Sequence, residues 1–285
     1  MKMNLKDLIM QRLVFGKTLV ELGAEYENLV VMDADVAQST QTHFFRDAYP
    51  DRFYQIGIAE QNMAGIAAGM STLGYIPFIS AFAVFMTQRA GDQIRNSIAH
   101  PRANVKINGG YGGLPTGRGG ATHSAVEDIA VMRCLPNMTI LEPADPRETE
   151  LCTRLAMEIE GPVYLRTVRC EVPVVFPEDH KVLLGKAFKV RDGKDVTIIS
   201  SGMMTPKAID AADGLAAQGV SVNMIHMPSI KPIDKEAILE AAETTKAIIT
   251  VENHSVIGGL GSAVCETVAE GYPCKVFRFG FKDVF

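Results

Sequence analysis

The stretch from Gln61 to Gln88 carries no charged side chain, and it restricts the fold of this chain more than any other feature. A stretch of this length without charge belongs either in a protein interior or in a membrane. The turn residues Gly74-Tyr75-Ile76-Pro77 divide it into a helix rich in small residues and a buried strand with its exit at 78–85. We therefore expect a helix and a strand of the core rather than a membrane span.

One acid, Glu60, stands at the start of this uncharged stretch, in the sequence Gly57-Ile58-Ala59-Glu60-Gln61-Asn62-Met63. Burying a carboxylate is costly unless it is paired or protonated. The residues alone leave two interpretations open. Glu60 is either an acid at a helix N-terminus, where negative charge is favoured, or a carboxylate with a chemical role.

Short apolar runs alternate with helical segments along the chain, which favours parallel sheets covered by helices. Strands are expected at 29–32, 105–108, 139–143 and 163–166, and again at 196–200, 220–225 and 247–251. Between these two groups, 171–180 is extended and interrupted by prolines. We predict an α/β chain of two doubly wound domains, 1–170 and a smaller 191–285, joined by a linker at 171–190.

Composition excludes several classes of function. The net charge is −5 without a basic run, which argues against a nucleic-acid surface. The five cysteines show no close paired spacing, so neither a zinc cluster nor a disulfide framework is indicated, and no metal site is expected in this chain. The start of the chain lacks an apolar signal core. A reducing, cytoplasmic setting and no membrane association are expected.

The residues around Glu60 resemble the glutamate motif of the pyrimidine-binding domain of the transketolase family. Similar residues at 33–39, 82–85, 122–123 and 135–138 recur in the family's order and approximate spacing, so the resemblance covers nearly the whole chain. It implies that Glu60 hydrogen-bonds the aminopyrimidine ring of thiamine diphosphate as the catalytic, activating acid. It also implies two α/β domains, one that binds the pyrimidine and one like the transketolase C-terminal domain.

The resemblance assigns further cofactor-binding residues. Phe82 and Phe85 would line the pyrimidine pocket, although at strand spacing both are equally compatible with core packing. Gln88 and Asp35 occupy positions near the cofactor. His123, a second catalytic residue, follows the glycine-rich segment 109–122 and would contact the ketose hydroxyls.

Substrate-binding residues also follow from the resemblance. Arg12, Ser39 and Arg169 fall where transketolases grip a sugar phosphate, and guanidinium groups bind phosphate in a bidentate way. Arg118 adds a cation, and Gly119 stands where many transketolases carry an aspartate that recognises a substrate hydroxyl. Tyr111 also replaces a histidine that often helps there. The donor and acceptor therefore stay open, and a branched sugar or a sulfonate is compatible with these changes.

The chain lacks a Gly-Asp-Gly motif followed by the asparagine that would bind Mg²⁺ and the cofactor diphosphate. The resemblance therefore implies an N-terminal transketolase subunit as partner, in an α2β2 assembly that transfers a two-carbon ketol unit between sugar phosphates. One alternative is the beta subunit of a 2-oxo acid dehydrogenase, against which the three phosphate anchors argue. Another is a scaffold that kept the fold and lost the chemistry.

A second glycine-rich run, 258–262, precedes a helix-like segment. Such a run is typical of a phosphate-binding helix N-terminus, but it is also found in the C-terminal domain of this family, which has no catalytic residues. The nearby His254 is accordingly expected to be structural or to lie at an interface.

Overall fold

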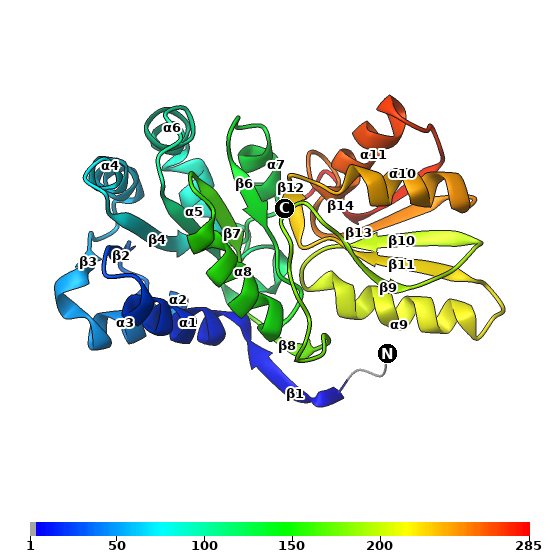
Figure 1. Cartoon of the computed structure of the whole chain (residues 1–285), viewed down its shortest axis with the longest axis horizontal. Coiled ribbons are helices and arrows are strands. Elements are labelled where there is room, and N and C mark those ends of the chain that lie inside the picture. The colour runs from blue at the N-terminus through cyan, green and yellow to red at the C-terminus, as the bar shows by residue number, and fades with distance from the viewer. Residues whose placement is uncertain (1–3) are drawn as a thin grey trace.

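The computed structural model describes residues 4–285, apart from the side chains of residues 4–7 and of Arg118. Two large sheets lie one after the other along the molecule, each with helices on both faces (Figure 1). The first sheet has seven strands, in the order β12 (Ser229–Lys231), β6 (Thr139–Leu141), β7 (Val163–Arg166), β5 (Lys106–Gly110), β4 (Ile76–Phe82), β2 (Leu29–Asp33) and β3 (Phe53–Gln55).

Strand β2 shows why the first sheet forms. All of its residues are buried, because helices cover both faces of the sheet. Leu29 and Val31 pack on one face with apolar side chains of three helices, α1 (Gln11–Glu25), α3 (His43–Ala48) and α8 (Pro146–Glu158). Val30 and Met32 pack on the opposite face with α4 (Glu60–Ser71), α7 (Asp128–Arg133) and the π-helical turn Ile94–Ala99.

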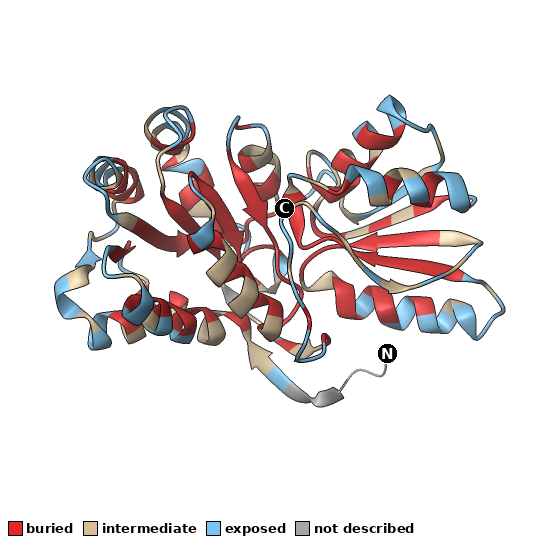
Figure 2. Ribbon diagram, viewed as in Figure 1, coloured by how far each residue is buried: buried red, intermediate tan, exposed pale blue. Residues whose placement is uncertain are grey.

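The second sheet contains five strands, in the order β14 (Val276–Phe281), β13 (Ile248–Ser255), β10 (Val196–Ser200), β11 (Val222–His226) and β9 (Phe188–Arg191). Helix α9 (Met204–Ala216) packs on one face. The other face is covered by α10 (Lys235–Thr244) and α11 (Leu260–Glu270). Figure 2 shows the outcome for both sheets, with buried strands at the centre and helices exposed on their outer sides.

Short elements complete the chain. They are the strands β1 (Asn4–Met10) and β8 (Glu171–Val174), the helices α2 (Ala37–Thr40), α5 (Ala83–Gln88) and α6 (Gly91–Gln93), and the 3₁₀ segments Pro50–Arg52 and Leu114–Gly119. The start of the expected linker therefore forms β8, which pairs antiparallel with β1. In the segment 78–85, expected to be a buried strand and its exit, the strand ends at Phe82 and Phe85 lies on helix α5.

The two sheets are joined by more than the connecting chain. Strand β12 comes after the second sheet has begun, yet it pairs antiparallel with β6 of the first sheet, with Ser229 opposite Leu141. Apolar side chains of both halves also form one continuous core cluster, which includes Ile140 of β6 and Ile225 of β11. Among the described residues, no helix is long and apolar enough to cross a membrane.

A buried cluster of one glutamate and two histidines connects α8 to the second sheet. The carboxylate of Glu148 lies 2.8 Å from Nε2 of His180 and 2.7 Å from Nε2 of His226, and it accepts the backbone N–H of Ala144. Burial alone would raise the pKa of Glu148, but the charge of His226 and these hydrogen bonds lower it to about 2. The ionised carboxylate thus holds together three segments that are distant in sequence.

Candidate active site

The candidate site lies where the central parallel strands of the first sheet end. β2 ends at Asp33, β4 at Phe82 and β5 at Gly110, and the three ends lie side by side in the sheet. Open α/β sheets bind ligands at the carboxyl ends of their strands. Asp33 shapes this edge, because its carboxylate accepts hydrogen bonds from Thr40, Thr42 and the backbone of Val36.

Glu60 is the first residue of helix α4, and the residue is only 3% exposed. One oxygen of its carboxylate, Oε1, accepts a hydrogen bond of 3.0 Å from Nη1 of Arg89. Both earlier interpretations of Glu60 therefore stay compatible with its place, since it starts a helix and is also a buried charge at the strand ends. Arg89 was missed in the sequence, although it is the first charged residue after the uncharged stretch that Glu60 opens.

Four rings gather at the strand ends, and one of them, Phe85, lies under the guanidinium of Arg89, the partner of Glu60. The rings of Phe82 and Phe85 stack with centroids 5.5 Å apart, and Tyr111 stacks on Phe82 at 4.1 Å. The imidazole of His123 meets Phe85 edge to face at 5.3 Å. The sequence left core packing open for both phenylalanines. The structure brings them together with His123, which core packing alone does not require.

Two arginines flank Tyr111. The guanidinium of Arg12 donates a 2.9 Å hydrogen bond to the hydroxyl of Tyr111 and a 3.0 Å hydrogen bond to the backbone carbonyl of Ser39. The guanidinium carbon of Arg169 lies 5.7 Å from the centroid of the same ring, and Arg169 donates to the carbonyl of Thr116. The predicted anion-binding residues Arg12, Ser39 and Arg169 are thus neighbours, with Tyr111 at their centre.

Tyr111 has a φ of 61°, in the left-handed region that bulky residues rarely adopt. A strained backbone of this kind persists only where the surroundings enforce it, and such positions concentrate at functional sites. Here the stacking on Phe82 and the contact with Arg12 hold the ring in place.

Other predicted residues lie outside this group. Gln88 is exposed and donates to the carboxylate of Glu127. Asp35 is also exposed, and its described contact is a hydrogen bond from its backbone N–H to the side chain of Gln55. The side chain of Arg118 lies outside the described residues. The proposed roles of these three residues stay predictions.

The loop that carries His123 is closely packed. A Cβ atom at Gly119 would lie 2.8 Å from Cβ of His123 and 3.1 Å from Cγ2 of Thr116. The hydroxyl of Thr122 lies 2.9 Å from Nδ1 of His123, which restrains the imidazole. Gly119 is therefore needed for the loop to approach the histidine this closely.

The second glycine-rich run has a structural explanation. The carboxylate of Glu252 accepts the backbone N–H groups of Leu260 and Gly261, so the protein itself occupies the N-terminus of α11. Burial raises the pKa of Glu252 to about 7. His254 is buried and accepts the backbone N–H of Ala130 from the first half of the chain, as expected for an interface residue.

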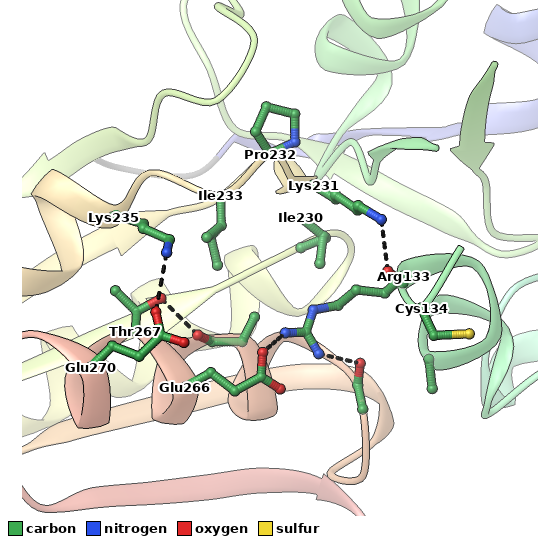
Figure 3. Close-up of a pocket in the computed structure, with 13 residues that line it drawn as sticks. Arg133, Cys134, Ile230, Lys231, Pro232, Ile233, Lys235, Glu266, Thr267 and Glu270 are labelled. Atoms are coloured by element: carbon green, nitrogen blue, oxygen red, sulfur yellow. Dashed lines mark hydrogen bonds and ion pairs between the residues drawn. The ribbon is translucent and has the colours of Figure 1, made fainter. Parts of the chain in front are cut away.

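A large cavity of about 750 Å³ lies away from Glu60, between α7, β12, α10 and α11 (Figure 3). Two of its cations form ion pairs, since Arg133 contacts Glu266 and Lys235 lies 3.3 Å from Glu270. The third, Lys231, donates to the backbone carbonyl of Arg133. Within the described part of the chain, no group of three or more His, Cys, Asp or Glu side chains is placed to hold a metal ion.

Comparison with known proteins identifies the family. The family model for the transketolase pyrimidine binding domain matches residues 8–174, and that for the transketolase C-terminal domain matches residues 185–284. The chain belongs to the transketolase family and consists of these two domain types. Its predicted α/β fold of two such domains is confirmed.

Individual relatives have nearly the same extent. A putative transketolase C-terminal section from Methanocaldococcus jannaschii is 44% identical over 95% of this chain and 86% of the relative. A 6-deoxy-6-sulfo-D-fructose transketolase subunit from Clostridium sp. is 38% identical over 94% of this chain and 84% of the relative. An apulose-4-phosphate transketolase subunit from Phocaeicola vulgatus is 40% identical, over 97% of this chain and 89% of the relative.

A solved structure supports the same conclusion. It is described as a split gene transketolase, inactive beta4 tetramer, and it is 50% identical with a TM-score of 0.91, covering 97% of this chain and 90% of the other. The predicted similarity to the C-terminal subunit of a split transketolase is therefore confirmed. The matches do not favour the dehydrogenase alternative.

Proposed function

We propose that this chain is the pyrimidine-binding subunit of a thiamine-diphosphate-dependent transketolase. It would transfer a two-carbon ketol unit from a phosphorylated or otherwise anionic ketose to an aldose. The observation that carries this proposal is the buried carboxylate of Glu60, connected through Arg89 to the ring of Phe85, which packs with Phe82 and His123.

The residues present fit the pyrimidine half of the cofactor. A flat heteroaromatic ring needs an aromatic face for stacking, which Phe85 offers, and a hydrogen-bonding partner for its ring nitrogen, which Glu60 offers. When bound, thiamine diphosphate supplies the chemistry of carbon–carbon bond cleavage and formation. The protein's part is to bind and orient the cofactor and the sugar, and to exchange protons with them.

Each residue then has a definite task. Glu60 exchanges a proton with the ring nitrogen of the pyrimidine from a largely water-free position. His123 donates hydrogen bonds to substrate oxygens on which charge develops. Arg12 and Arg169, with Tyr111 between them, hold the anionic end of the sugar and so align its carbonyl group.

Diphosphate and Mg²⁺ binding are assigned to a partner subunit. Helix α4 offers a docking face for that partner next to Glu60. Gly65 and Gly69 are exposed on it with open space around them, and Ile58 and Leu73 expose 74% and 76% of their surface nearby. An uncharged helix face with glycines permits close approach of another chain. An α2β2 assembly places such a face between the two kinds of subunit.

The relatives and the arginines of the site indicate an anionic sugar as the class of substrate. Two relatives are named for 6-deoxy-6-sulfo-D-fructose and for apulose-4-phosphate, and both sugars carry an anionic group. The Arg12–Tyr111–Arg169 group suits either a phosphate or a sulfonate. Gly119, in place of an aspartate that would read a substrate hydroxyl, is consistent with an unusual sugar rather than a common pentose phosphate.

The test begins with the partner. The tagged chain is purified from its native cell, and the co-purifying protein is identified by mass spectrometry. A subunit with a diphosphate-binding and metal-binding motif supports the proposal. A lipoyl acyltransferase would instead indicate a dehydrogenase complex, and the absence of any stoichiometric partner would favour a scaffold.

Glu60→Gln in the reconstituted complex then tests the chemistry. We expect ketol transfer to fall by about 10²- to 10⁴-fold, because the amide cannot exchange the proton. Glu243→Gln, an exposed change on α10, is the matched control and should leave the rate unchanged. A Glu60→Gln complex with normal turnover would refute the proposed role of this carboxylate.

A further inference from the structure

Arg89 is the one partner of Glu60 among the described side chains, and the proposed function gives it no task. It follows helix α5, and half of its side chain is exposed, whereas the side chain of Glu60 is 4% exposed. Its Nη1 lies 3.0 Å from Oε1 of Glu60. At the same time, its guanidinium carbon lies 4.1 Å from the ring centroid of Phe85.

These two contacts are the same two that an aminopyrimidine needs. A guanidinium is planar, carries N–H donors in its plane, and stacks on aromatic faces. Arg89 thus uses the carboxylate of Glu60 and a face of Phe85 as a flat heteroaromatic ring would. Phe82 and His123 contact Phe85 as well, at centroid distances of 5.5 Å and 5.3 Å, which limits the room left on that ring.

The ion pair and the proposed chemistry compete for the same carboxylate. Glu60 must offer this group to the ring nitrogen of the pyrimidine, but its Oε1 already accepts a hydrogen bond from Nη1 of Arg89.

Arg89 is able to leave. Half of its side chain is exposed, so the guanidinium lies close to solvent and can move outward into water. An ion pair at such a position is weak enough to be exchanged for another ligand.

We propose that Arg89 is a gate on the pyrimidine site: it holds Glu60 and covers Phe85, and the pyrimidine of thiamine diphosphate displaces it. This inference rests on the proposed function. Until it is displaced, Arg89 keeps the buried carboxylate paired, and a site that is competent only part of the time lowers the apparent affinity for its ligand.

The experiment measures thiamine diphosphate affinity by calorimetry, with Mg²⁺, in the complex with the partner subunit. Arg89→Met should bind the cofactor about three- to thirtyfold more tightly than the wild type, because the competitor is gone. Arg95→Met, at an exposed arginine in the π-helical turn Ile94–Ala99, is the matched control for the loss of one positive charge. It should bind no more tightly than the wild type.

The direction in which Arg89→Met changes the cofactor affinity decides whether Arg89 is a gate or a positioning residue. If Arg89 instead positions Glu60 for the cofactor, Arg89→Met will bind more weakly, and an unchanged affinity would equally overturn the gate. Arg89→Lys, which keeps the charge but lacks the planar group, should lie between wild type and Arg89→Met. A double-mutant cycle of Arg89→Met and Glu60→Gln in the thermal unfolding of the chain alone should show coupling between the two side chains, and zero coupling would also overturn the gate.

Failure of the proposed function is distinguishable from failure of the gate. If the wild-type complex binds no thiamine diphosphate, both proposals fall together. If the wild type binds and Arg89→Met binds no more tightly, only the gate is wrong.

Discussion

At the scale of single residues, the candidate site depends on close packing, as between Gly119 and His123, as much as on its functional groups. The order of the motifs in the sequence allowed Glu60, Phe82, Phe85 and His123 to be proposed together. It did not reveal Arg89, because an arginine near a helix end is usually solvated and its partner is 29 positions away. The tight contact between Gly119 and His123 was also unpredictable, since it depends on how one loop folds on itself.

Gly119→Ala tests that contact. The added Cβ would lie 2.8 Å from Cβ of His123, so the histidine must shift. We expect turnover in the reconstituted complex to fall by about tenfold or more, as for a misplaced catalytic group, with little change in thermal stability. Gly214→Ala, on α9 with open space around it, is the control and should be neutral. Steady-state kinetics equal to wild type would contradict this account of the loop.

By the same reasoning, restoring the family's aspartate at Gly119 alone should not convert the substrate preference. Its Cβ meets the same obstruction, so the loop would need compensating changes.

At the scale of elements, the central strands were predictable, whereas the edge strands β3, β9 and β14 and the tertiary pairings were not. Strand β10 has the predicted bounds, because five apolar or small residues in a row are typical of a fully buried strand. Strand β12 was missed. It has only three residues, and its pairing with β6 comes from distant parts of the chain rather than from any local pattern.

Substitutions on helix α4 test whether this helix is the docking face for the partner subunit. A Cβ atom added at Gly65 or Gly69 meets nothing within 4 Å, and changing each residue to leucine should raise helix stability by about 1 kcal/mol. We expect the double variant to fold and yet to bind the partner subunit at least about tenfold more weakly, because two large side chains block close approach. Calorimetric titration of the double variant with the partner subunit measures this affinity.

Gly214→Leu on α9 is the control for an exposed helix glycine. Undiminished association of the α4 double variant would show that the partner docks elsewhere.

At the scale of the whole molecule, buried charges hold the two sheets together. Glu148 is the central group, and its pKa in the folded protein, about 2, lies below its ordinary value of 4.5. An acid with a lowered pKa contributes stability above its unfolded pKa and loses it as the pH falls through the folded pKa. Sequence inspection could not find this cluster, because His180 and His226 come from segments with no shared motif.

Stability should therefore fall between about pH 4.5 and pH 2, by on the order of 3 kcal/mol from this group. Glu148→Gln should be less stable than wild type at pH 7, and the difference between the two proteins should shrink over that pH interval. Urea unfolding at a series of pH values measures both. A difference that does not change with pH would mean that the carboxylate charge has no part in joining the halves.

Strand β12 has a consequence for protein engineering. The family matches divide the chain between residues 174 and 185, yet β12 lies beyond that division and completes the edge of the first sheet. A chimera that exchanges the C-terminal domain between relatives would also replace this edge strand. Such exchanges should succeed only when the incoming strand matches β6 of the recipient, so the two sequence domains are not interchangeable modules.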